Sequence, residues 1–285
     1  LFYDSTKPLP VSKFRDDIHV IGVPLTGICN EAYKLPRERQ LFKNICYVGA
    51  LSHLIGIEPA VIEELLKEEF ASKPKLIGAN LNAFSLGRDW AAIHLKPIGL
   101  QLKRADAVGN RIFVEGNQAA ALGAVYGGAT VCAWYPITPS TSLAEAFTGY
   151  CEDLRTDEDG SKRYAIVQAE DEIASIGIVV GAGWNGARAF TCTSGPGISL
   201  MNEFIGLSYF AEIPAVIFDV QRGGPSTGMP TRTQQSDLLL AAYASHGDTK
   251  HVLLLPEDPR ELFEFTALSF DLAERLQTPI FVLED

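Results

Sequence analysis

The sequence lacks the cysteine pairs, histidine pairs and phosphate-loop glycines on which several common kinds of site depend. Its five cysteines are widely spaced without a C-x-x-C pair, so we expect neither disulfides nor a zinc or iron–sulfur site held by this chain alone. We expect them to be small core residues in a reducing cytosol. The five histidines show no H-x-x-x-H spacing, so no metal site is expected. No G-x-x-x-x-G-K-[ST] motif is present, which excludes a phosphate-loop nucleotide hydrolase.

Positive charge and long apolar runs are also scarce. The 24 Lys and Arg residues are outnumbered by 35 Asp and Glu residues, and the net charge of −11 argues against nucleic acid or an anionic membrane as a partner. The longest apolar run, residues 173–184, is too short to span a membrane and predicts a buried helix. No signal peptide is visible, and we expect a cytoplasmic location. The chain begins without methionine and ends on an apparent strand, which indicates a piece of a longer protein.

The first part of the chain, residues 1–87, has a mixed pattern of strand and helix. We expect a strand at 19–25, a helix at 36–56 with one apolar face, and a second helix at 59–70. The composition then changes, and residues 88–110, which include Pro97, Asp106 and Gly109, predict a linker.

From residue 111 to residue 285 strands and helices alternate. The expected strands are continuous apolar runs, which is typical of strands buried on both faces, and so predicts an α/β domain with a parallel sheet covered by helices on both faces. The expected strands are 112–114, 130–134, 165–167, 187–193, 214–220, 251–255 and 279–283. The expected helices are 115–128, 142–154, 171–181, 198–210, 235–243 and 259–276.

Polar side chains follow several of these strands at the point where each ends. The sequence Y-P-I-T-P-S at 135–140, Glu170 and Arg222 stand at three such ends, and a glycine-rich turn at 193–197 stands at a fourth. In parallel sheets ligands bind beyond the carboxyl ends of the strands, so we expect a binding site at this edge. Each feature also has a structural interpretation. The hydroxyls after the stiff proline turn could cap a helix, Glu170 could complement a helix dipole with Asp171 as the better cap, and Arg222 could be a surface residue.

Two further motifs lack the context that they require. The G-x-G-x-x-G at 181–186 closes a helix and precedes a strand, the reverse of a dinucleotide fingerprint, and is better interpreted as a helix end and turn. The G-x-S-x-G at 224–228 would make Ser226 a hydrolase nucleophile, with Asp237 and then His246 or His251 following in hydrolase order. Pro230 and further polar residues delay the next helix, so a serine hydrolase remains only a remote alternative.

Four motifs together resemble one family. The motifs are E-G-N-Q-A-A-A-L-G-A at 115–124, Y-P-I-T-P-S-T at 135–141, T-S-G-P-G at 193–197 and D-V-Q-R-G-G-P-S-T-G at 219–228. They resemble the α subunit of 2-oxoacid:ferredoxin oxidoreductases over residues 111–285. Residues 1–87, with N-I-C-Y-V-G-A-L at 44–51, resemble the last part of the family's γ domain. A γ domain fused ahead of α is similar to the 2-oxoglutarate-type subunits.

The resemblance implies a thiamine-diphosphate enzyme with a pyrimidine-binding domain of parallel-sheet type, preceded by a partial α/β γ domain. A separate β subunit would hold the diphosphate, Mg²⁺ and [4Fe-4S] clusters, and coenzyme A would be a co-substrate. The implied reaction is decarboxylation of 2-oxoglutarate to succinyl-CoA and CO₂ with reduction of ferredoxin, in an (αβ)₂ assembly. Pyruvate and branched-chain 2-oxoacids remain alternative substrates, and a regulatory or scaffolding relative without catalysis is an alternative of another class.

The same resemblance implies roles for six residues. A carboxyl group hydrogen-bonded to N1′ of the aminopyrimidine assists deprotonation of the cofactor, and the resemblance gives this role to Glu170. The cofactor-binding residues are expected to be Glu170, Pro136 and Ile137. The substrate's carboxylate would bind Arg222 in a bidentate manner with a hydroxyl from Thr138, and Tyr135 would complete the substrate-binding set.

Overall fold

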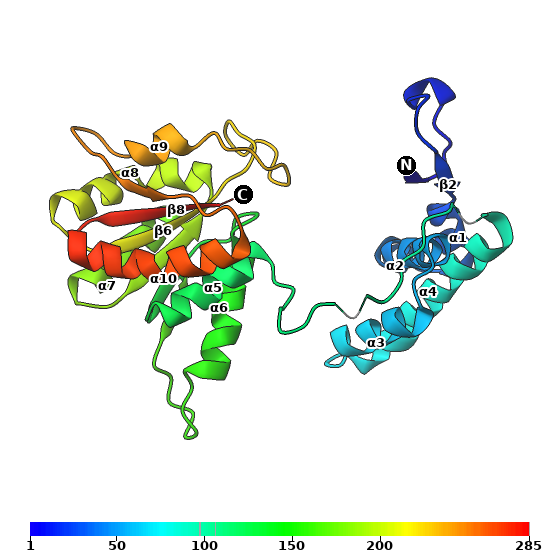
Figure 1. Cartoon of the computed structure of the whole chain (residues 1–285), viewed down its shortest axis with the longest axis horizontal. Coiled ribbons are helices and arrows are strands. Elements are labelled where there is room, and N and C mark those ends of the chain that lie inside the picture. The colour runs from blue at the N-terminus through cyan, green and yellow to red at the C-terminus, as the bar shows by residue number, and fades with distance from the viewer. Residues whose placement is uncertain (97, 106, 285) are drawn as a thin grey trace. The chain divides into compact units, whose positions relative to one another are not determined.

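The computed structural model describes residues 1–96, 98–105 and 107–284. The chain divides into two compact units, Leu1–Arg111 and Ile112–Asp285, which are described separately (Figure 1). Pro97 and Asp106, which contributed to the expected linker, lie outside the described residues. Within the described ranges, no helix combines the length and apolar character that crossing a membrane requires.

The first unit joins a small parallel sheet to a group of helices. Its buried core is formed by side chains from β2, α1, α2 and α4, among them Val23, Cys29, Cys46 and Ala91. Strands β1 and β2 pair in parallel. Its elements are β1 (Phe2–Asp4), the 3₁₀ helix η1 (Val11–Lys13), β2 (Ile21–Val23), α1 (Leu25–Ala32), α2 (Pro36–Ile55), α3 (Pro59–Glu69) and α4 (Pro74–His94).

Helices α2 and α4 cross with their backbones in contact, because a glycine lies on each side of the crossing. A Cβ atom on Gly49 would lie 2.0 Å from the Phe84 carbonyl oxygen, and one on Gly87 would lie 1.9 Å from the Cys46 carbonyl oxygen. No side chain fits at either position without moving a helix apart from its neighbour. The crossing therefore requires glycine in both helices.

Helix α4 corrects the expected linker, since it continues through residues 88–94 to His94. The sequence pattern did not reveal it because its buried positions are mostly small or polar residues, among them Asn80, Ala83, Gly87 and Ala91. Helix α1 and strand β1 were also not expected. Helices α2 and α3 were predicted to within a residue of their observed ends.

The second unit contains a six-stranded sheet in the order β4-β3-β5-β6-β8-β7, and every pairing is parallel. Strands β6 and β8 are buried along their whole length, which fits their continuous apolar sequences. The strands are β3 (Val131–Trp134), β4 (Ala165–Gln168), β5 (Ala189–Thr193), β6 (Ala215–Val220), β7 (Val252–Leu254) and β8 (Pro279–Glu284). The expected strand at 112–114 does not form, and Ile112 and Phe113 are exposed.

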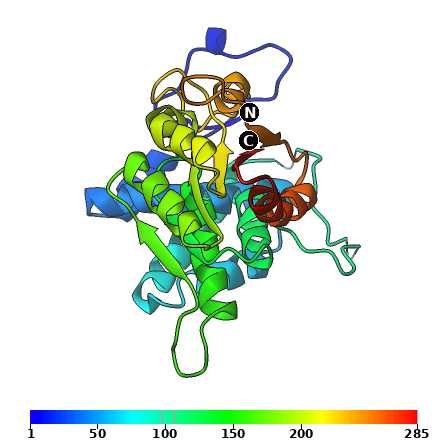
Figure 2. The ribbon, with the colours of Figure 1, turned by 90° about the vertical axis from the view of Figure 1, so that its left-hand side faces the viewer.

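Helices cover both faces of this sheet, as predicted (Figures 1 and 2). One core lies between the sheet and α5, α6 and α10, and includes the edge-to-face rings of Phe147, Phe190 and Phe218. The other lies between the sheet and α7, α8 and α9. Figure 1 shows α10 and α9 on opposite sides of β8. The helices are α5 (Gly116–Tyr126), α6 (Thr141–Leu154), α7 (Glu172–Trp184), α8 (Gly195–Phe210), α9 (Leu238–Ala242) and α10 (Pro259–Leu276).

Candidate active site

The carboxyl ends of the parallel strands meet at one edge of the second unit's sheet. The segments that follow β3, β5 and β6 lie next to one another there, because these strands are neighbours in the sheet. The turn after β4 lies beside the end of β3, since the Ala169 N–H donates to the Trp134 carbonyl oxygen at 2.8 Å. The four segments singled out in the sequence therefore share this edge, as their positions predicted.

The turn after β3 is held by the hydroxyl groups that follow it. The Ile137 N–H donates to the Thr141 Oγ1 at 3.1 Å, and the Ser140 hydroxyl donates to the Ile137 carbonyl oxygen at 3.1 Å. The Asn117 side-chain amide, from α5, donates to the Pro139 carbonyl oxygen at 3.0 Å and to the Ser142 Oγ at 2.6 Å. These hydroxyls therefore fix the turn, but the helix cap that the sequence suggested does not form, because no side-chain hydrogen bond caps α6 at Ser140.

Ser194, which precedes α8, joins three strand ends. Its buried hydroxyl lies 2.7 Å from the Val220 carbonyl oxygen and 3.4 Å from the Thr138 carbonyl oxygen. Thr138 follows β3 and Val220 ends β6, so the serine draws the segments that carry Thr138 and Arg222 together. Sequence analysis treated this stretch only as a glycine-rich turn and missed the role of Ser194, as it missed that of Asn117.

Thr138 and Arg222 line one cavity of about 350 Å³ at this edge, which we call the strand-end cavity. Its wall also includes Asn117, Arg232 and Glu284, and it lies wholly within the second unit. The other predicted site residues lie outside its wall as far as the chain is described: Tyr135, Pro136, Ile137 and Glu170. The structure therefore brings together the two expected carboxylate-binding residues and leaves the expected cofactor residues beside them.

Arg222 is buried although no counter-ion bonds to it. Only 6% of its surface is exposed, and among the described residues its Nε has no hydrogen-bond partner. Its charge acts on Asp237, whose carboxyl pKa stays above the ordinary value because burial raises it by more than the Arg222 guanidinium lowers it. A buried guanidinium with an unused donor is costly to maintain, which is typical of a group awaiting an anionic ligand.

A second buried carboxyl, Asp219, lies near the end of β6. It has no exposed surface, and neither carboxyl oxygen has a hydrogen-bond partner in the part of the chain that is described. Burial raises its pKa well above the usual range, and the nearby carboxyls of Asp237 and Glu284 raise it further. Burial and the neighbouring carboxyls therefore favour the protonated form of Asp219.

Two glutamates follow β4, and the structure separates them by burial. Glu170 is exposed, whereas Glu172, the first residue of α7, has only 6% of its surface exposed. Asp171 caps α7 through its Oδ1, which accepts the Ala174 N–H at 2.7 Å, so the sequence prediction for Asp171 is confirmed. A Cβ on Gly197 would lie 2.9 Å from the Glu172 Cγ, which places Glu172 against the first turn of α8. The Glu172 carboxylate has no hydrogen-bond partner among the described residues.

The motif around Ser226 does not form a nucleophile elbow. Ser226 lies in the long segment between β6 and α9, and α9 begins only at Leu238. An elbow requires the nucleophile on an abrupt turn from a strand directly into a helix. The glycines at 181–186 lie at the end of α7, as expected for a helix end. All five cysteines are buried, which confirms them as core residues.

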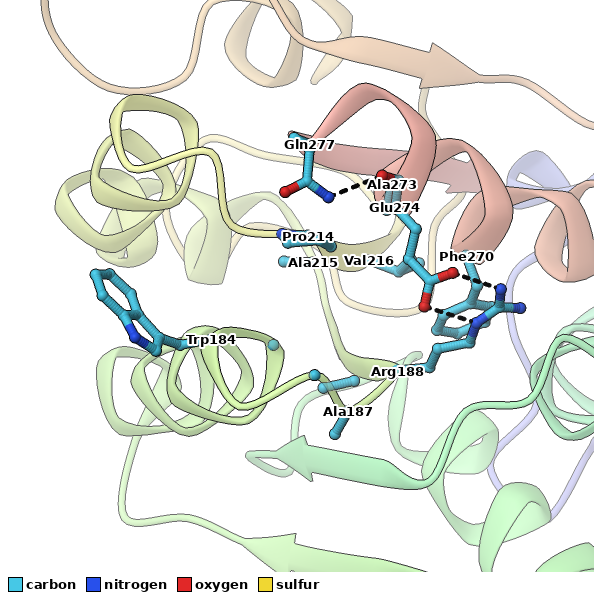
Figure 3. Close-up of a pocket in the computed structure, with 13 residues that line it drawn as sticks. Trp184, Ala187, Arg188, Pro214, Ala215, Val216, Phe270, Ala273, Glu274 and Gln277 are labelled. Carbon is cyan, nitrogen blue, oxygen red and sulfur yellow. Dashed lines mark hydrogen bonds and ion pairs between the residues drawn. The ribbon is translucent and has the colours of Figure 1, made fainter.

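A different cavity, of about 250 Å³, lies at the opposite edge of the sheet, near the start of β5 and β6 (Figure 3). Its cation, Arg188, is already neutralised, because it forms two hydrogen bonds to the Glu274 carboxylate at 3.0 and 2.6 Å. The same guanidinium contacts Asp271 at 2.8 Å. This cavity therefore lacks the unpaired cation that marks the strand-end cavity.

Comparisons with known proteins agree with the motifs. Residues 122–285 match the family described as pyruvate flavodoxin/ferredoxin oxidoreductase, thiamine diP-bdg, and residues 1–90 match pyruvate ferredoxin/flavodoxin oxidoreductase. The 2-oxoacid:ferredoxin oxidoreductase 1 subunit alpha of Aeropyrum pernix is 38% identical over 94% of this chain and 42% of its own length. The 2-oxoglutarate synthase subunit KorA of Methanocaldococcus jannaschii is 46% identical over 61% of this chain and 45% of its own length.

One solved structure is similar over nearly the whole chain. The 2-oxoglutarate:ferredoxin oxidoreductase from Magnetococcus marinus, with 2-oxoglutarate, coenzyme A and succinyl-CoA bound, is 35% identical, with a TM-score of 0.71. The match covers 99% of this chain and 47% of that one, so this chain spans less than half the length of the relatives it matches. The matched domains and the motifs at the strand ends lead to one conclusion: the chain belongs to the pyruvate flavodoxin/ferredoxin oxidoreductase family.

Proposed function

We propose that this chain supplies the pyrimidine-binding half of a thiamine-diphosphate-dependent enzyme. The proposed reaction converts 2-oxoglutarate and coenzyme A into succinyl-CoA and CO₂ while two ferredoxins each gain one electron. The observation that carries the proposal is the strand-end cavity, where Thr138 and the buried, unpaired Arg222 face the same space. A relative's structure contains 2-oxoglutarate, coenzyme A and succinyl-CoA, which supports the choice of substrates.

In this proposal Arg222 and Thr138 bind the carboxylate next to the keto group. A guanidinium matches a carboxylate with two parallel hydrogen bonds, and Arg222 has an unused buried donor for that purpose. The bound carboxylate fixes the keto carbon at one place in the cavity. Low exposure strengthens the interaction, since water competes little for the guanidinium. Tyr135, which follows β3 but is not part of the cavity wall, is the third member of the proposed set.

The cofactor end of the proposed site needs a carboxylate at the aminopyrimidine N1′. When bound, thiamine diphosphate supplies the carbanion that attacks the keto group and accepts the electron pair left by CO₂. A carboxylate from the β4–α7 connection would hold the proton at N1′. Glu170 is the residue proposed from the sequence, with Pro136 and Ile137 beside it. Burial and the absence of a partner favour Glu172 instead, because a hydrogen bond accepted by a buried carboxylate is stronger than one accepted by an exposed carboxylate.

The remaining parts of the proposed enzyme come from a partner. Relatives of this chain are named as alpha subunits, which supports the existence of a partner subunit. We propose that this β subunit holds the diphosphate, Mg²⁺ and [4Fe-4S] clusters. We further propose an (αβ)₂ assembly that delivers electrons to ferredoxin in the cytoplasm. The chain alone should then contain no iron and reduce no ferredoxin.

The experiment that tests this function uses the chain assembled with its partner subunit. Reduction of ferredoxin is measured with 2-oxoglutarate, pyruvate or 2-oxoisovalerate as substrate, each with and without coenzyme A and thiamine diphosphate. We expect the highest kcat/KM for 2-oxoglutarate and no turnover when thiamine diphosphate is omitted. A higher kcat/KM for pyruvate or 2-oxoisovalerate would make that acid the substrate in place of 2-oxoglutarate. An assembled complex that oxidises no 2-oxoacid would refute the function.

A further inference from the structure

The strand-end cavity contains a second arginine, Arg232, which the site described above does not use. The segment after β6 folds back on itself to place it there. The Gly223 N–H donates to the Arg232 carbonyl oxygen at 2.7 Å, and the Met229 N–H donates to the Gly223 carbonyl oxygen at 2.8 Å. Because Gly223 directly follows Arg222, these bonds hold the backbones of the two arginines near each other although they lie ten positions apart in sequence.

The fold-back also requires glycine at its tip. Gly228 has a φ of +47°, and a Cβ there would lie 2.0 Å from the Gly223 carbonyl oxygen. The Arg232 N–H closes the segment by donating to the Met229 carbonyl oxygen at 3.0 Å. The position of Arg232 is thus built by backbone hydrogen bonds and does not depend on its own side chain.

Neither guanidinium in the strand-end cavity has an ion-pair partner among the described residues. Arg188 at the opposite edge is, in contrast, held by two carboxylates. Of the two, Arg222 is buried and Arg232 is exposed at the open side of the cavity wall, and the chain as a whole has a net charge of −11. The cavity wall also carries two acidic residues, Glu115 just before α5 and Glu284 at the end of β8.

We propose that Arg232 binds the distal carboxylate of a dicarboxylic 2-oxoacid while Arg222 and Thr138 bind the carboxylate beside the keto group. This inference rests on the proposed function, since it assigns the second carboxylate of the proposed substrate. A volume of about 350 Å³ lies at the small end of ligand pockets, about 300–1,000 Å³, which suits a short dicarboxylate. Arg232 would also discriminate between substrates. A 2-oxoacid with an apolar side chain would displace water from the Arg232 guanidinium without offering it a hydrogen-bond acceptor.

The test compares Arg232→Gln and Arg232→Lys in the assembled complex, with Arg163→Gln as control. Arg163 is an exposed arginine of the second unit that pairs with Asp157 at 2.9 Å, so its replacement removes the same charge away from the cavity. We expect Arg232→Gln to lower kcat/KM for 2-oxoglutarate at least tenfold, which corresponds to about 1.4 kcal/mol. Arg232→Lys should retain part of this activity, and kcat/KM for 2-oxobutanoate should stay unchanged or rise.

Two outcomes would overturn the inference. One is an equal loss for 2-oxoglutarate and 2-oxobutanoate, which would make Arg232 a general structural residue. The other is an unchanged kcat/KM for 2-oxoglutarate together with a raised KM for coenzyme A, which would assign Arg232 to a phosphate of that co-substrate. Arg163→Gln should change none of these values.

A binding measurement separates failure of the inference from failure of the proposed function. Titration calorimetry follows glutarate and butyrate binding to the complex before and after Arg232→Gln. We expect the wild-type complex to bind glutarate at least tenfold more tightly than butyrate, and the variant to lose that preference. A complex that shows this preference but oxidises no 2-oxoacid would refute the function and retain the dicarboxylate site. A complex that oxidises 2-oxoglutarate but binds glutarate equally well in the variant would retain the function and refute the site.

Discussion

Replacement of Arg222 by glutamine should separate substrate binding from folding. A guanidinium–carboxylate pair contributes hydrogen bonds to a charged group, worth about 1.5–3 kcal/mol. Because 1.4 kcal/mol is tenfold, the KM for the 2-oxoacid should rise about 10- to 150-fold. The melting temperature should not fall, since Arg222 is 6% exposed and its Nε has no partner among the described residues to lose.

The assay is steady-state reduction of ferredoxin by the assembled complex, with thermal unfolding followed by circular dichroism on the same samples. Arg222→Lys keeps the charge but cannot form two parallel bonds, so its KM should lie between those of wild type and Arg222→Gln. Thr138→Val should raise KM in the same direction by a smaller factor, because it removes one neutral hydroxyl. Unchanged KM values in all three variants would refute the assignment, and so would a loss of activity explained fully by a lower melting temperature.

Three further predictions follow from the carboxyl and hydroxyl groups near the cavity. If a glutamate assists the cofactor, one of Glu172→Gln and Glu170→Gln should lower kcat by about 10²-fold or more with the fold intact. Burial favours Glu172 as that residue. Near-normal kcat in both variants would exclude the β4–α7 connection as the source of the cofactor's carboxylate. The pKa of Asp219 is raised by burial in the folded protein, so unfolding above about pH 3.8 releases a proton and the stability of wild type falls as the pH rises toward the folded-state pKa. The melting temperature of Asp219→Asn relative to wild type should therefore increase between pH 5 and pH 8, and a constant difference would show that Asp219 is ionised when folded. Ser226→Ala should leave kcat unchanged, whereas stoichiometric labelling of Ser226 by a serine-directed reagent would favour a hydrolase.

The sheet of the second unit could be predicted because its strands are apolar throughout. Strands such as β6 and β8, which are buried on both faces, appear in the sequence as continuous apolar runs. Because the strands are parallel, the polar residues that follow them meet at one edge of the sheet. Helix α4 was missed because glycine, alanine and asparagine occupy all but one of its buried positions, where the pattern requires large apolar residues. The strand predicted at 112–114 does not form, and the two edges of the described sheet are β4 and β7.

The site residues that directly follow strands could be predicted from the sequence, whereas those placed by tertiary packing could not. Thr138 follows β3 and Arg222 follows β6, and only β5 lies between these two strands, so the sheet brings both residues to the same edge. Arg232 reaches the same cavity only through backbone hydrogen bonds in an irregular segment, which no periodicity reveals. The choice between Glu170 and Glu172 depends on which side chain the first turn of α8 covers, and that is a property of tertiary packing.

The most direct test of the account is a structure of the assembled complex with 2-oxoglutarate and thiamine diphosphate, solved without coenzyme A. The account predicts that the carboxylate beside the keto group lies within hydrogen-bond distance of Arg222 and Thr138, with the aminopyrimidine N1′ at a glutamate of the β4–α7 connection. A 2-oxoglutarate molecule bound away from the strand-end cavity, or an aminopyrimidine held by another subunit, would contradict it.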